Sequence, residues 1–506
     1  MSKPKIKDVI SNQPDQNMEE ITEVTAAEIY DIKKRSVAGV LSYTIRTFLN
    51  YGVTLLAQIA FSFLLSAEQF GVYFIVTAII GIFTFLSDVG LAATLIQKKQ
   101  EPTLTELRTT FTVQQVLATV IFILIYLLTP FWQSSQNFGQ PELMLVYALG
   151  ASFWFASLKT IPSVLLERKL RFDQLVIPAL VENIVFYGLA TFLAWRGFGV
   201  SSFTYAVLAR SILGLIAVYL IQRWPIGFAF DWPTLKQMSN FGVKFQVNDL
   251  LARIKDDLFI LFLGSWLGPA AVGYTGWARQ WSRFPYNMTV TNVVAVTFPT
   301  FSRLQDKKEH LAKAIEKTLY FISLFIFPLL IGMSIFIFPL LQVIPDLEEW
   351  QPAAWSLVFF CLSILFAGLS SPLTNALNAT GKINKTLVLM VIWTVLTWTV
   401  TPVLVWLYGF DGVSLAALVI SAGTLILPVR YVQQSVPFRF WTNIWRQAVA
   451  TVVLTAVGLA GWQLWNNSLL WLLLGILLSG TAYAATFLII GWRSLQTELR
   501  SMGVLK

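Results

Sequence analysis

Long apolar runs, separated by short charged clusters, make up most of the chain from residue 38 onward. A helix needs about 20 consecutive apolar residues to cross a bilayer, and backbone groups in lipid must be hydrogen-bonded within their own segment. We therefore expect an all-α membrane protein with about fourteen transmembrane helices. The predicted spans cover residues 38–65, 70–96, 109–131, 143–165, 174–195, 199–222, 243–267, 271–297, 315–342, 353–377, 386–408, 412–429, 447–465 and 469–491.

The positive charges alternate between the two sides of this arrangement. Of the 36 Lys and Arg residues, 26 fall in the two tails and in every second connector, and nine fall inside the predicted spans. The opposite connectors hold one, Arg196. Because cytosolic loops of membrane proteins collect Lys and Arg, the pattern predicts that both termini face the cytosol.

Composition excludes several classes of protein. Of the 506 residues, 56% are hydrophobic and 12% are charged, against about 25% charged in soluble domains. Zinc sites and Ser/His/Asp or Cys/His catalysis use residue types that occur here once each, as Cys361 and His310. The net charge of +9 reflects the cytosolic bias of Lys and Arg, so we expect no nucleic-acid partner. No connector is long enough for a folded catalytic domain, so we expect a protein that is not an enzyme and has no cofactor or metal.

An internal repeat predicts the domain organisation. The segment Leu65–Tyr73 (LSAEQFGVY) resembles Leu267–Tyr274 (LGPAAVGY), about 200 residues and six spans later. An even offset preserves orientation, which predicts two parallel six-helix lobes with pseudo-twofold symmetry around a central cavity. The alternative is chance similarity of two short turns. The predicted parts are a disordered cytosolic tail (1–36), an N-lobe (37–222), a cytosolic linker (223–242), a C-lobe (243–434), and two additional helices with a cytosolic tail (435–506).

Ionisable groups lie deep inside several predicted spans. An Arg at the centre of a membrane costs about 2.5–3.5 kcal/mol on insertion scales, so these groups must line water, pair with each other or bind a ligand. The groups are Arg46, Asp88, Glu182, Arg210, Asp249, Arg253, Lys255, Asp256, Asp257, Arg279 and Arg283.

The seventh predicted span carries a charged stripe. At 100° per residue, Asp249, Asp256 and Asp257 lie on the same side of the helix as Arg253. Lys255 points away from this stripe, which favours a different contact for it. The stripe predicts one wall of a hydrated cavity. Structural ion pairs between helices are the alternative, above all for Arg253 with Asp249.

The eighth span carries Arg279 and Arg283, which are four residues apart and share a face with Asn287. Neither arginine has an acidic neighbour in its own span, which favours a ligand-facing role. We predict a substrate-binding set of Arg46, Arg210, Arg253, Arg279 and Arg283.

Acidic groups within the spans are candidate carriers of a driving ion, either protons or sodium. The predicted ion-coupling set is Asp88, Glu182, Asp249, Asp256 and Asp257. Polar contacts between helices explain Asp88 and Glu182 equally well. Lys159 lies near the cytosolic end of its span, so we expect its side chain to extend to the lipid headgroups.

Several short stretches resemble the polysaccharide transporter family, the Wzx-type oligosaccharide flippases, which share a superfamily with MATE antiporters and the lipid II flippase MurJ. The resemblance covers roughly residues 38–430 in order and spacing. The matching stretches are Phe70-Gly71-Val72-Tyr73, Ser87-Asp88-Val89-Gly90-Leu91, Leu95-Ile96-Gln97, Glu167-Arg168-Lys169-Leu170-Arg171-Phe172, Gly197-Phe198-Gly199-Val200, Asp257-Leu258-Phe259-Ile260, Gly273-Tyr274, Phe298-Pro299-Thr300-Phe301-Ser302-Arg303-Leu304-Gln305 and Ala376-Leu377-Asn378-Ala379-Thr380-Gly381-Lys382.

The resemblance implies a flippase in the bacterial cytoplasmic membrane. It would move undecaprenyl-pyrophosphate-linked oligosaccharides across the membrane by alternating access, for cell-surface polysaccharide synthesis. Its partners would be this substrate, membrane lipids, and polysaccharide polymerase and assembly proteins. The alternative within the superfamily is a MATE-like cation-coupled multidrug antiporter, whose site should be dominated by carboxylates and aromatics. A membrane-embedded glycosyltransferase or polymerase is disfavoured because the chain has no sizeable external loop.

Overall fold

The computed structural model describes residues 50–87, 91–98, 100–136, 138–169 and 171–501, and every regular element in this part of the chain is a helix. The contacts within the chain divide it after Thr54, and the arrangement below concerns the unit that begins at Leu55. All fourteen predicted spans coincide with helices wherever they are described. By length and composition, ten of the described helices could each cross a membrane. The all-α membrane fold is therefore confirmed.

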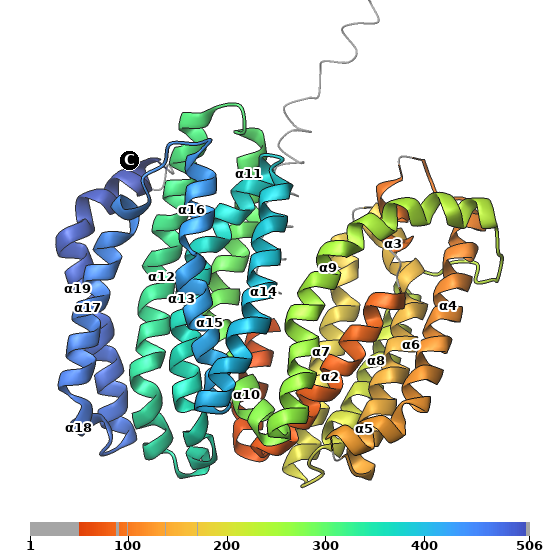
Figure 1. The fold of residues 1–506 in the computed structure, drawn as a ribbon, viewed down its shortest axis with the longest axis horizontal. Helices are drawn as coiled ribbons and strands as arrows, with labels where there is room; N and C mark the ends of the chain where they lie inside the picture. Colours follow the sequence, from red (N-terminus) through yellow and green to blue (C-terminus); the bar gives the residue numbers. More distant parts are fainter. Residues whose placement is uncertain (1–49, 88–90, 99, 137, 170, 502–506) are drawn as a thin grey trace, which may run out of the picture. The chain divides into compact units, whose positions relative to one another are not determined.

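The first group of helices corresponds to the predicted N-lobe (Figure 1). It begins with the helix Asn50–Leu64. The others are α2 (Ala67–Ser87), α3 (Leu91–Gln97), α4 (Leu104–Leu127), α5 (Thr129–Gln136), α6 (Gln140–Arg168), α7 (Phe172–Trp195) and α8 (Ser201–Ile221). The predicted cytosolic tail (1–36) lies outside the described residues.

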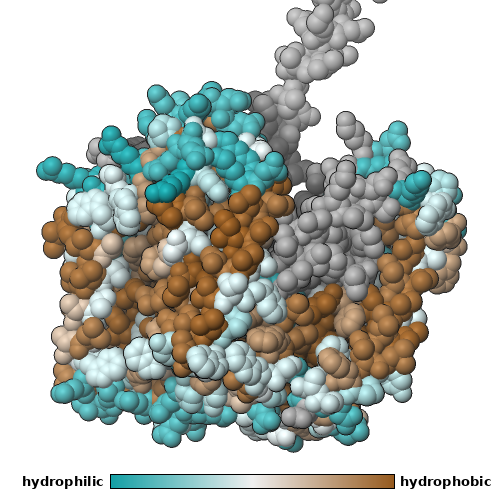
Figure 2. All heavy atoms as spheres, viewed as in Figure 1, coloured by the Kyte–Doolittle hydropathy of each residue, from teal (hydrophilic) through white to brown (hydrophobic). Residues whose placement is uncertain are grey.

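The second group follows in the chain and corresponds to the predicted C-lobe, with the additional helices at its edge, while its first helix lies beside α2 and α3 of the first group (Figure 1). Its helices are α9 (Trp232–Leu267), α10 (Pro269–Tyr286), η1 (Asn287–Thr291), α11 (Asn292–Arg303), α12 (Lys308–Val343), η2 (Pro345–Ala353), α13 (Ala354–Ala379), α14 (Ile383–Tyr408), α15 (Asp411–Thr424) and α16 (Ile426–Gln433). The additional helices are α17 (Phe440–Ala460), α18 (Trp462–Trp465) and α19 (Leu469–Ser501). Apolar residues form a band across the visible face, with hydrophilic residues at both ends (Figure 2), as a bilayer requires.

Helix α9 starts earlier than its apolar run predicts. It begins at Trp232, within the predicted linker, because the Asp231 carboxylate accepts a 3.0 Å hydrogen bond from the backbone N–H of Thr234 and caps the first turn. With 36 residues at about 1.5 Å each, α9 is much longer than a bilayer requires. Its polar first turns therefore continue into the segment that was predicted to span the membrane.

The two repeated segments lie against each other where α2 meets α10. A Cβ atom on Gly71 would come within 1.7 Å of the Pro269 carbonyl oxygen, and one on Gly273 within 1.7 Å of the Ala67 carbonyl oxygen. Each glycine thus occupies the same place against the opposite helix, which is what a twofold relation between the repeats produces. Only glycine allows the two backbones to approach this closely.

Further contacts across this junction come from η2, which follows α12. Trp350 is fully buried, and its indole N–H donates to the backbone oxygen of Ser62 at 2.8 Å. Trp277 of α10 stacks on Trp350 with ring centroids 4.9 Å apart and donates to the Ser62 hydroxyl at 2.8 Å. Glu349 accepts a 2.8 Å hydrogen bond from the N–H of Ala67 at the start of α2. These contacts tie the N-lobe to the C-lobe at one end of the molecule.

Candidate functional site

A cavity of about 560 Å³ lies at the place where the charged faces of α9 and α10 meet. Residues of α13, α14 and α15 complete its wall, and within the part of the chain that the structure describes, Phe74 of α2 is the one lining residue from the N-lobe. The ring of Phe74 reaches this wall because it packs over Gly276, where a Cβ would come within 2.4 Å of the ring. The sequence predicted a cavity enclosed by both lobes. Its described lining residues come mainly from the predicted C-lobe, and a central cavity shared by both lobes stays a prediction.

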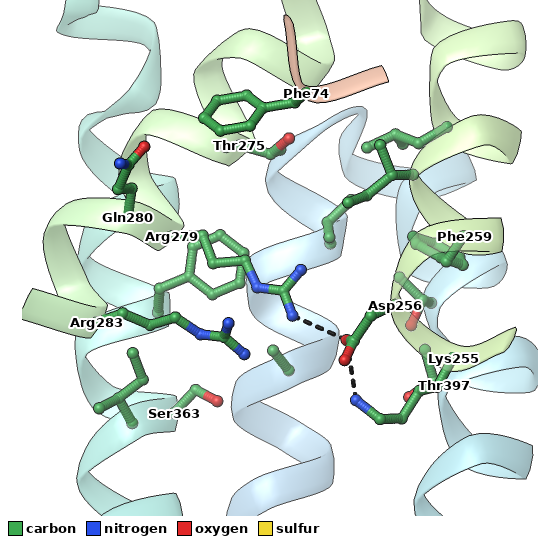
Figure 3. Close-up of a pocket in the computed structure, with 18 of the residues that line it drawn as sticks. Phe74, Lys255, Asp256, Phe259, Thr275, Arg279, Gln280, Arg283, Ser363 and Thr397 are labelled. Atoms are coloured by element: carbon green, nitrogen blue, oxygen red, sulfur yellow. Dashed lines mark hydrogen bonds and ion pairs between the residues drawn. The ribbon is translucent and has the colours of Figure 1, made fainter. Parts of the chain in front are cut away.

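Four charged side chains line the cavity, and three of them form one cluster (Figure 3). The Asp256 Oδ1 accepts hydrogen bonds from Arg279 Nη2 at 2.8 Å and from Lys255 Nζ at 2.9 Å. Arg283, one turn from Arg279, points into the same space (Figure 3) and pairs with no carboxylate among the described residues. Among the described residues, three cations and one carboxylate give the lining a net charge of +2.

The chain breaks its helical hydrogen bonding just beyond Arg283. Pro285 cannot donate a backbone hydrogen bond, and the π-turn η1 follows at Asn287–Thr291. Two carbonyls at this irregularity accept hydrogen bonds from side chains. The Thr289 hydroxyl donates to the Pro285 oxygen at 2.7 Å, and the Asn292 amide donates to the Met288 oxygen at 3.0 Å. Backbone irregularities of this kind are tolerated in membranes beside cavities, and this one keeps Asn287 on the cavity wall.

The electrostatics of the cavity favour an anionic ligand. Arg279 and Arg283 are four residues apart on one face of α10, so their like charges repel each other. Asp256 compensates only part of the three positive charges around it. In the low dielectric of a membrane protein, uncompensated cations need water or an anion beside them. Guanidinium groups match phosphate oxygens in bidentate geometry.

Most of the other predicted site residues lie elsewhere or outside the described set. Arg210 of α8 stands over the Phe186 ring at 4.9 Å and is not among the residues lining the cavity. Asp257 has a partner of its own and also does not line it. The residues Arg46 and Asp88, and the side chains of Asp249 and Arg253, lie outside the described set. Their proposed roles stay predictions.

Glu182 forms an ion pair with Lys159, so Lys159 does not extend to the headgroups as expected. The pair joins α7 to α6, and α8 makes room for it with Gly214, where a Cβ would come within 2.1 Å of the Glu182 carboxylate. The alternative interpretation of Glu182, a polar contact between helices, matches this geometry. Its ion-coupling role stays a prediction.

Lys255 is the cavity residue whose role the sequence misjudged. We expected it to point away from the charged stripe, yet its ammonium group binds the neighbouring Asp256 and lines the cavity. Angles on a helical wheel describe where a side chain starts, whereas the long lysine stem can bend back toward a carboxylate. The signal available in the sequence was adjacency: a Lys directly before two aspartates.

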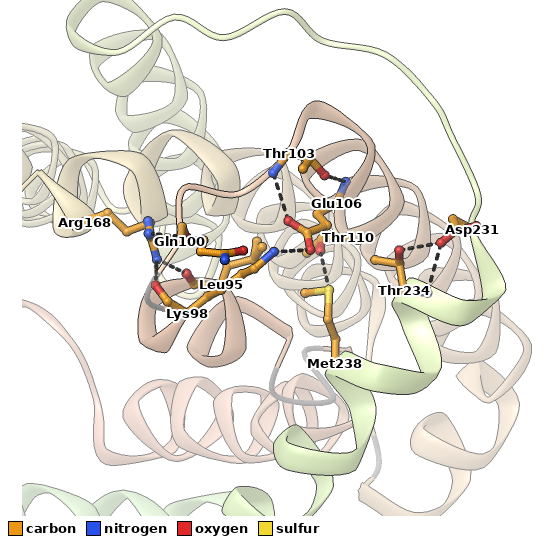
Figure 4. A network of polar contacts seen from close by, with 10 residues as sticks. All are labelled: Leu95, Lys98, Gln100, Thr103, Glu106, Thr110, Arg168, Asp231, Thr234 and Met238. Carbon is orange, nitrogen blue, oxygen red and sulfur yellow. Dashed lines mark hydrogen bonds and ion pairs between the residues drawn. The ribbon is translucent and has the colours of Figure 1, made fainter. Parts of the chain in front are cut away.

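Two stretches that carry the family resemblance meet at the end predicted to be cytosolic (Figure 4). The Arg168 guanidinium donates to the carbonyl oxygens of Lys98 at 2.7 Å and Gln100 at 2.8 Å, and also to that of Leu95. It thereby satisfies backbone acceptors left free where α3 ends. Helix α9 also packs against this region, since the Thr94 hydroxyl donates to the Met238 backbone oxygen at 3.2 Å. These residues hold the scaffold together and do not contribute to the cavity.

Comparison with known proteins identifies relatives for most of this chain. A family model described as "Polysaccharide biosynthesis protein" matches residues 61–354. Teichuronic acid biosynthesis protein TuaB of Bacillus subtilis (strain 168) is 24% identical over 58% of this chain and 61% of its own length. Lipopolysaccharide biosynthesis protein WzxC of Escherichia coli (strain K12) is 21% identical over 70% of this chain and 72% of its own length. The chain thus spans less than two thirds of the length of TuaB.

A solved structure has the same fold. The lipid II flippase MurJ, in an inward closed conformation, aligns with 90% of this chain and 100% of its own chain, with a TM-score of 0.75 and 15% sequence identity. Identity at this level shows the fold alone.

Proposed function

We propose that this chain, which belongs to the polysaccharide biosynthesis protein family, is a flippase that moves a diphosphate-linked lipid oligosaccharide across the membrane. The printed names of TuaB and WzxC place those proteins in the synthesis of surface polysaccharides. MurJ, which has the same fold, is named a lipid II flippase. Transport of an undecaprenyl-pyrophosphate-linked unit across the bacterial cytoplasmic membrane, with both termini in the cytosol, fits these names and the distribution of Lys and Arg.

The observation that carries the proposal is the cation pair Arg279 and Arg283 in a membrane-embedded cavity with a net charge of +2. A diphosphate offers paired oxygens to each guanidinium. Arg283, which has no carboxylate partner among the described residues, makes the first contact. Arg279 then exchanges its bond to Asp256 for one to the second phosphate. The polyprenyl tail stays in the bilayer, and the sugars occupy the hydrated space.

Alternating access assigns a role to the junction between the lobes. The Gly71–Gly273 contact and the buried Trp350 lie beside the cavity-lining residues Phe74 and Gly276. In the form described here, these contacts close that end of the cavity. We propose that transport breaks these contacts and separates α2 from α10. The cavity then opens at this end, and the substrate leaves on the opposite side of the membrane from the one where it entered. Proton or sodium coupling through acidic residues of the spans, and handover to polymerase and assembly proteins, belong to the same proposal.

The second candidate is a MATE-like cation-coupled antiporter. The aromatic lining residues Phe74, Phe259 and Phe360 favour it, since aromatic faces attract organic cations. The charge of the cavity opposes it, because a positively charged ligand would meet three cations and one carboxylate. The two candidates therefore make opposite predictions about the sign of the ligand.

Reconstitution of the full chain into vesicles tests the proposal. The substrate is a fluorescent polyprenyl-diphosphate oligosaccharide, and its arrival in the opposite leaflet is followed by accessibility to a membrane-impermeant quencher. We expect the double substitution Arg279→Ala and Arg283→Ala to slow translocation on the order of 100-fold, since each removes a charge-assisted hydrogen-bonding group.

The matched control is Arg196→Ala, whose guanidinium packs on the Trp195 and Phe192 rings in the opposite connector. It should leave translocation unchanged. Efflux of a cationic dye is measured on the same vesicles. If the double variant loses dye efflux while lipid translocation persists, the chain is an antiporter and the flippase proposal is wrong.

A further inference from the structure

Asp256 occupies an unusual place for a carboxylate in a cavity that binds an anion. It comes from α9 and faces the cations of α10 across the open space (Figure 3). Its Oδ1 holds both Arg279 and Lys255 within 2.9 Å. Any phosphate that settles between Arg279 and Arg283 therefore lies close to this carboxylate. A binding site optimised only for affinity would have no negative charge there, since the charge weakens every anionic ligand.

We propose that Asp256 is a specificity-determining residue that matches the charge of the cavity to a diphosphate substituted at both ends. The inference rests on the proposed function and refines its substrate class. With Asp256 ionised, the lining residues that the structure describes carry a net charge of +2. A diphosphate that bears a lipid on one phosphorus and a sugar on the other carries one negative charge per phosphorus. The ligand thus neutralises the cavity, and neither charge is left uncompensated.

Two related lipids do not match this charge. A polyprenyl diphosphate without sugar ends in a terminal phosphate, which carries about 1.5 to 2 negative charges at pH 7. Its additional oxyanion has to approach the Asp256 carboxylate, and like charges in a low dielectric repel strongly. A polyprenyl glycosyl monophosphate carries one charge and leaves one cation unpaired. Discrimination by repulsion is effective because binding differences between similar ligands are otherwise small.

The selection has a consequence for which lipid occupies the transporter. A reaction that transfers the glycan from the lipid to a growing polymer releases the polyprenyl diphosphate, which is the more highly charged lipid. Repulsion by Asp256 keeps this spent carrier out of the cavity. The transporter then takes up loaded lipid even when the unloaded carrier is abundant in the same membrane.

Binding measurements on the full chain in nanodiscs test the proposal. Three short-chain probes are compared: the polyprenyl diphosphate, the same diphosphate bearing one sugar, and the polyprenyl glycosyl monophosphate. We expect the wild-type protein to bind the sugar-bearing diphosphate most tightly. Asp256→Asn should shift the preference toward the unsubstituted diphosphate on the order of tenfold, because it removes one negative charge beside the extra oxyanion.

Two variants serve as controls. Asp346→Asn removes the same charge from η2, outside the cavity, and should leave the ranking unchanged. Asp256→Glu keeps the charge and should keep the wild-type order. The wild-type ranking tests the proposal even if Asp256→Asn does not fold.

The outcomes separate this inference from the function on which it rests. If the wild type binds all three lipids equally, or if Asp256→Asn keeps the wild-type ranking, the role of Asp256 is wrong while the flippase proposal stands. If the wild type binds no diphosphate lipid, the proposed function itself is wrong, and the role of Asp256 with it.

Discussion

The two lobes share one fold but use their membrane-embedded charges differently. In the N-lobe, Lys159 pairs with Glu182, and Arg210 stands over the Phe186 ring. In the C-lobe, Arg279 and Arg283 face a cavity in which Arg279 and Lys255 share one carboxylate, Asp256, and Arg283 has none among the described residues. The comparison teaches that a charge inside a span is not by itself a sign of function. What distinguishes the C-lobe is an excess of cations over carboxylates around an open space.

The repeat makes this difference explicit. Gly71 and Gly273 occupy corresponding places in the two lobes, and their separation along the chain sets the offset between related positions. At that offset, Thr77 and Gly81 of α2 correspond to Arg279 and Arg283 of α10. The N-lobe thus lacks cations where the C-lobe has them. The two helices are therefore related in backbone position, but only α10 carries cationic side chains at these two positions.

The largest expected effect comes from breaking the N-lobe ion pair. Lys159→Met leaves the Glu182 carboxylate without its partner, and removal of one member of a buried pair costs about 3–5 kcal/mol. Since the two side chains keep 18% and 26% of their exposure, we expect about 3 kcal/mol, the lower end. Thermal unfolding in detergent measures it. The matched change Arg283→Met should leave stability equal or higher. Equal losses in both variants would contradict the distinction between the lobes.

The junction between the lobes, where α2 meets α10, is the next test. Gly71→Ala drives a methyl group into the Pro269 carbonyl oxygen at 1.7 Å, so α2 and α10 must move apart. Overpacking of this kind costs about 1–3 kcal/mol, and cross-linking between cysteines placed on the two helices should fall. Gly188→Ala in α7 is the control, because no other atom lies within 4 Å of the new methyl group. If Gly71→Ala behaves like Gly188→Ala, the close approach of the two helices is wrong.

A smaller effect on stability is expected at Trp350, at the same junction. Trp350→Phe keeps an aromatic ring against Trp277 but removes the indole N–H that donates to the Ser62 backbone oxygen. Loss of one neutral hydrogen bond costs about 1 kcal/mol. Thermal unfolding again measures the change. Trp355→Phe is a control, since Trp355 is 54% exposed. A larger loss in the control than at Trp350 would show that this junction does not tie the lobes together.

The smallest effect concerns the start of α9, which joins the two regions. Two hydrogen bonds from Thr234 hold the pKa of Asp231 below its ordinary 3.8. The larger effect comes from the hydroxyl and the smaller from the backbone N–H. A lowered pKa in the folded state stabilises the protein above the unfolded pKa, and this contribution is lost as the pH falls through the folded value. The protection of the amides in the first turn of α9, relative to their exchange in the unfolded chain at the same pH, should therefore fall below pH 3.8. Asp231→Ala should show the lower protection already at pH 7, and unchanged protection would contradict the cap.

Much of the fold could be predicted from the sequence because a bilayer restricts the options. Apolar length and the alternation of Lys and Arg identify helices and connectors without any knowledge of packing. The Gly71 and Gly273 repeat predicted two related lobes, and the spacing of Arg279 and Arg283 predicted that they share a face. Each of these inferences uses information within one helix or one connector.

The errors all involve contacts between elements or the flexibility of long side chains. Lys159 was expected at the headgroups because it lies near the cytosolic end of its span, whereas its partner Glu182 comes from the next helix. Lys255 bends back toward Asp256 despite its angle on the helix. Tertiary packing decides such features, and periodicity does not report it.

The central claim, a cationic C-lobe cavity that receives a diphosphate, is tested most directly by imaging the ligand. Electron cryomicroscopy of the full chain in nanodiscs, with a short-chain polyprenyl-diphosphate sugar bound, would locate both phosphorus atoms. The account predicts density for the diphosphate between the Arg279 and Arg283 guanidinium groups, with the Asp256 carboxylate facing it. Diphosphate density elsewhere, with acyl chains or protein side chains packed against these two arginines, would contradict it.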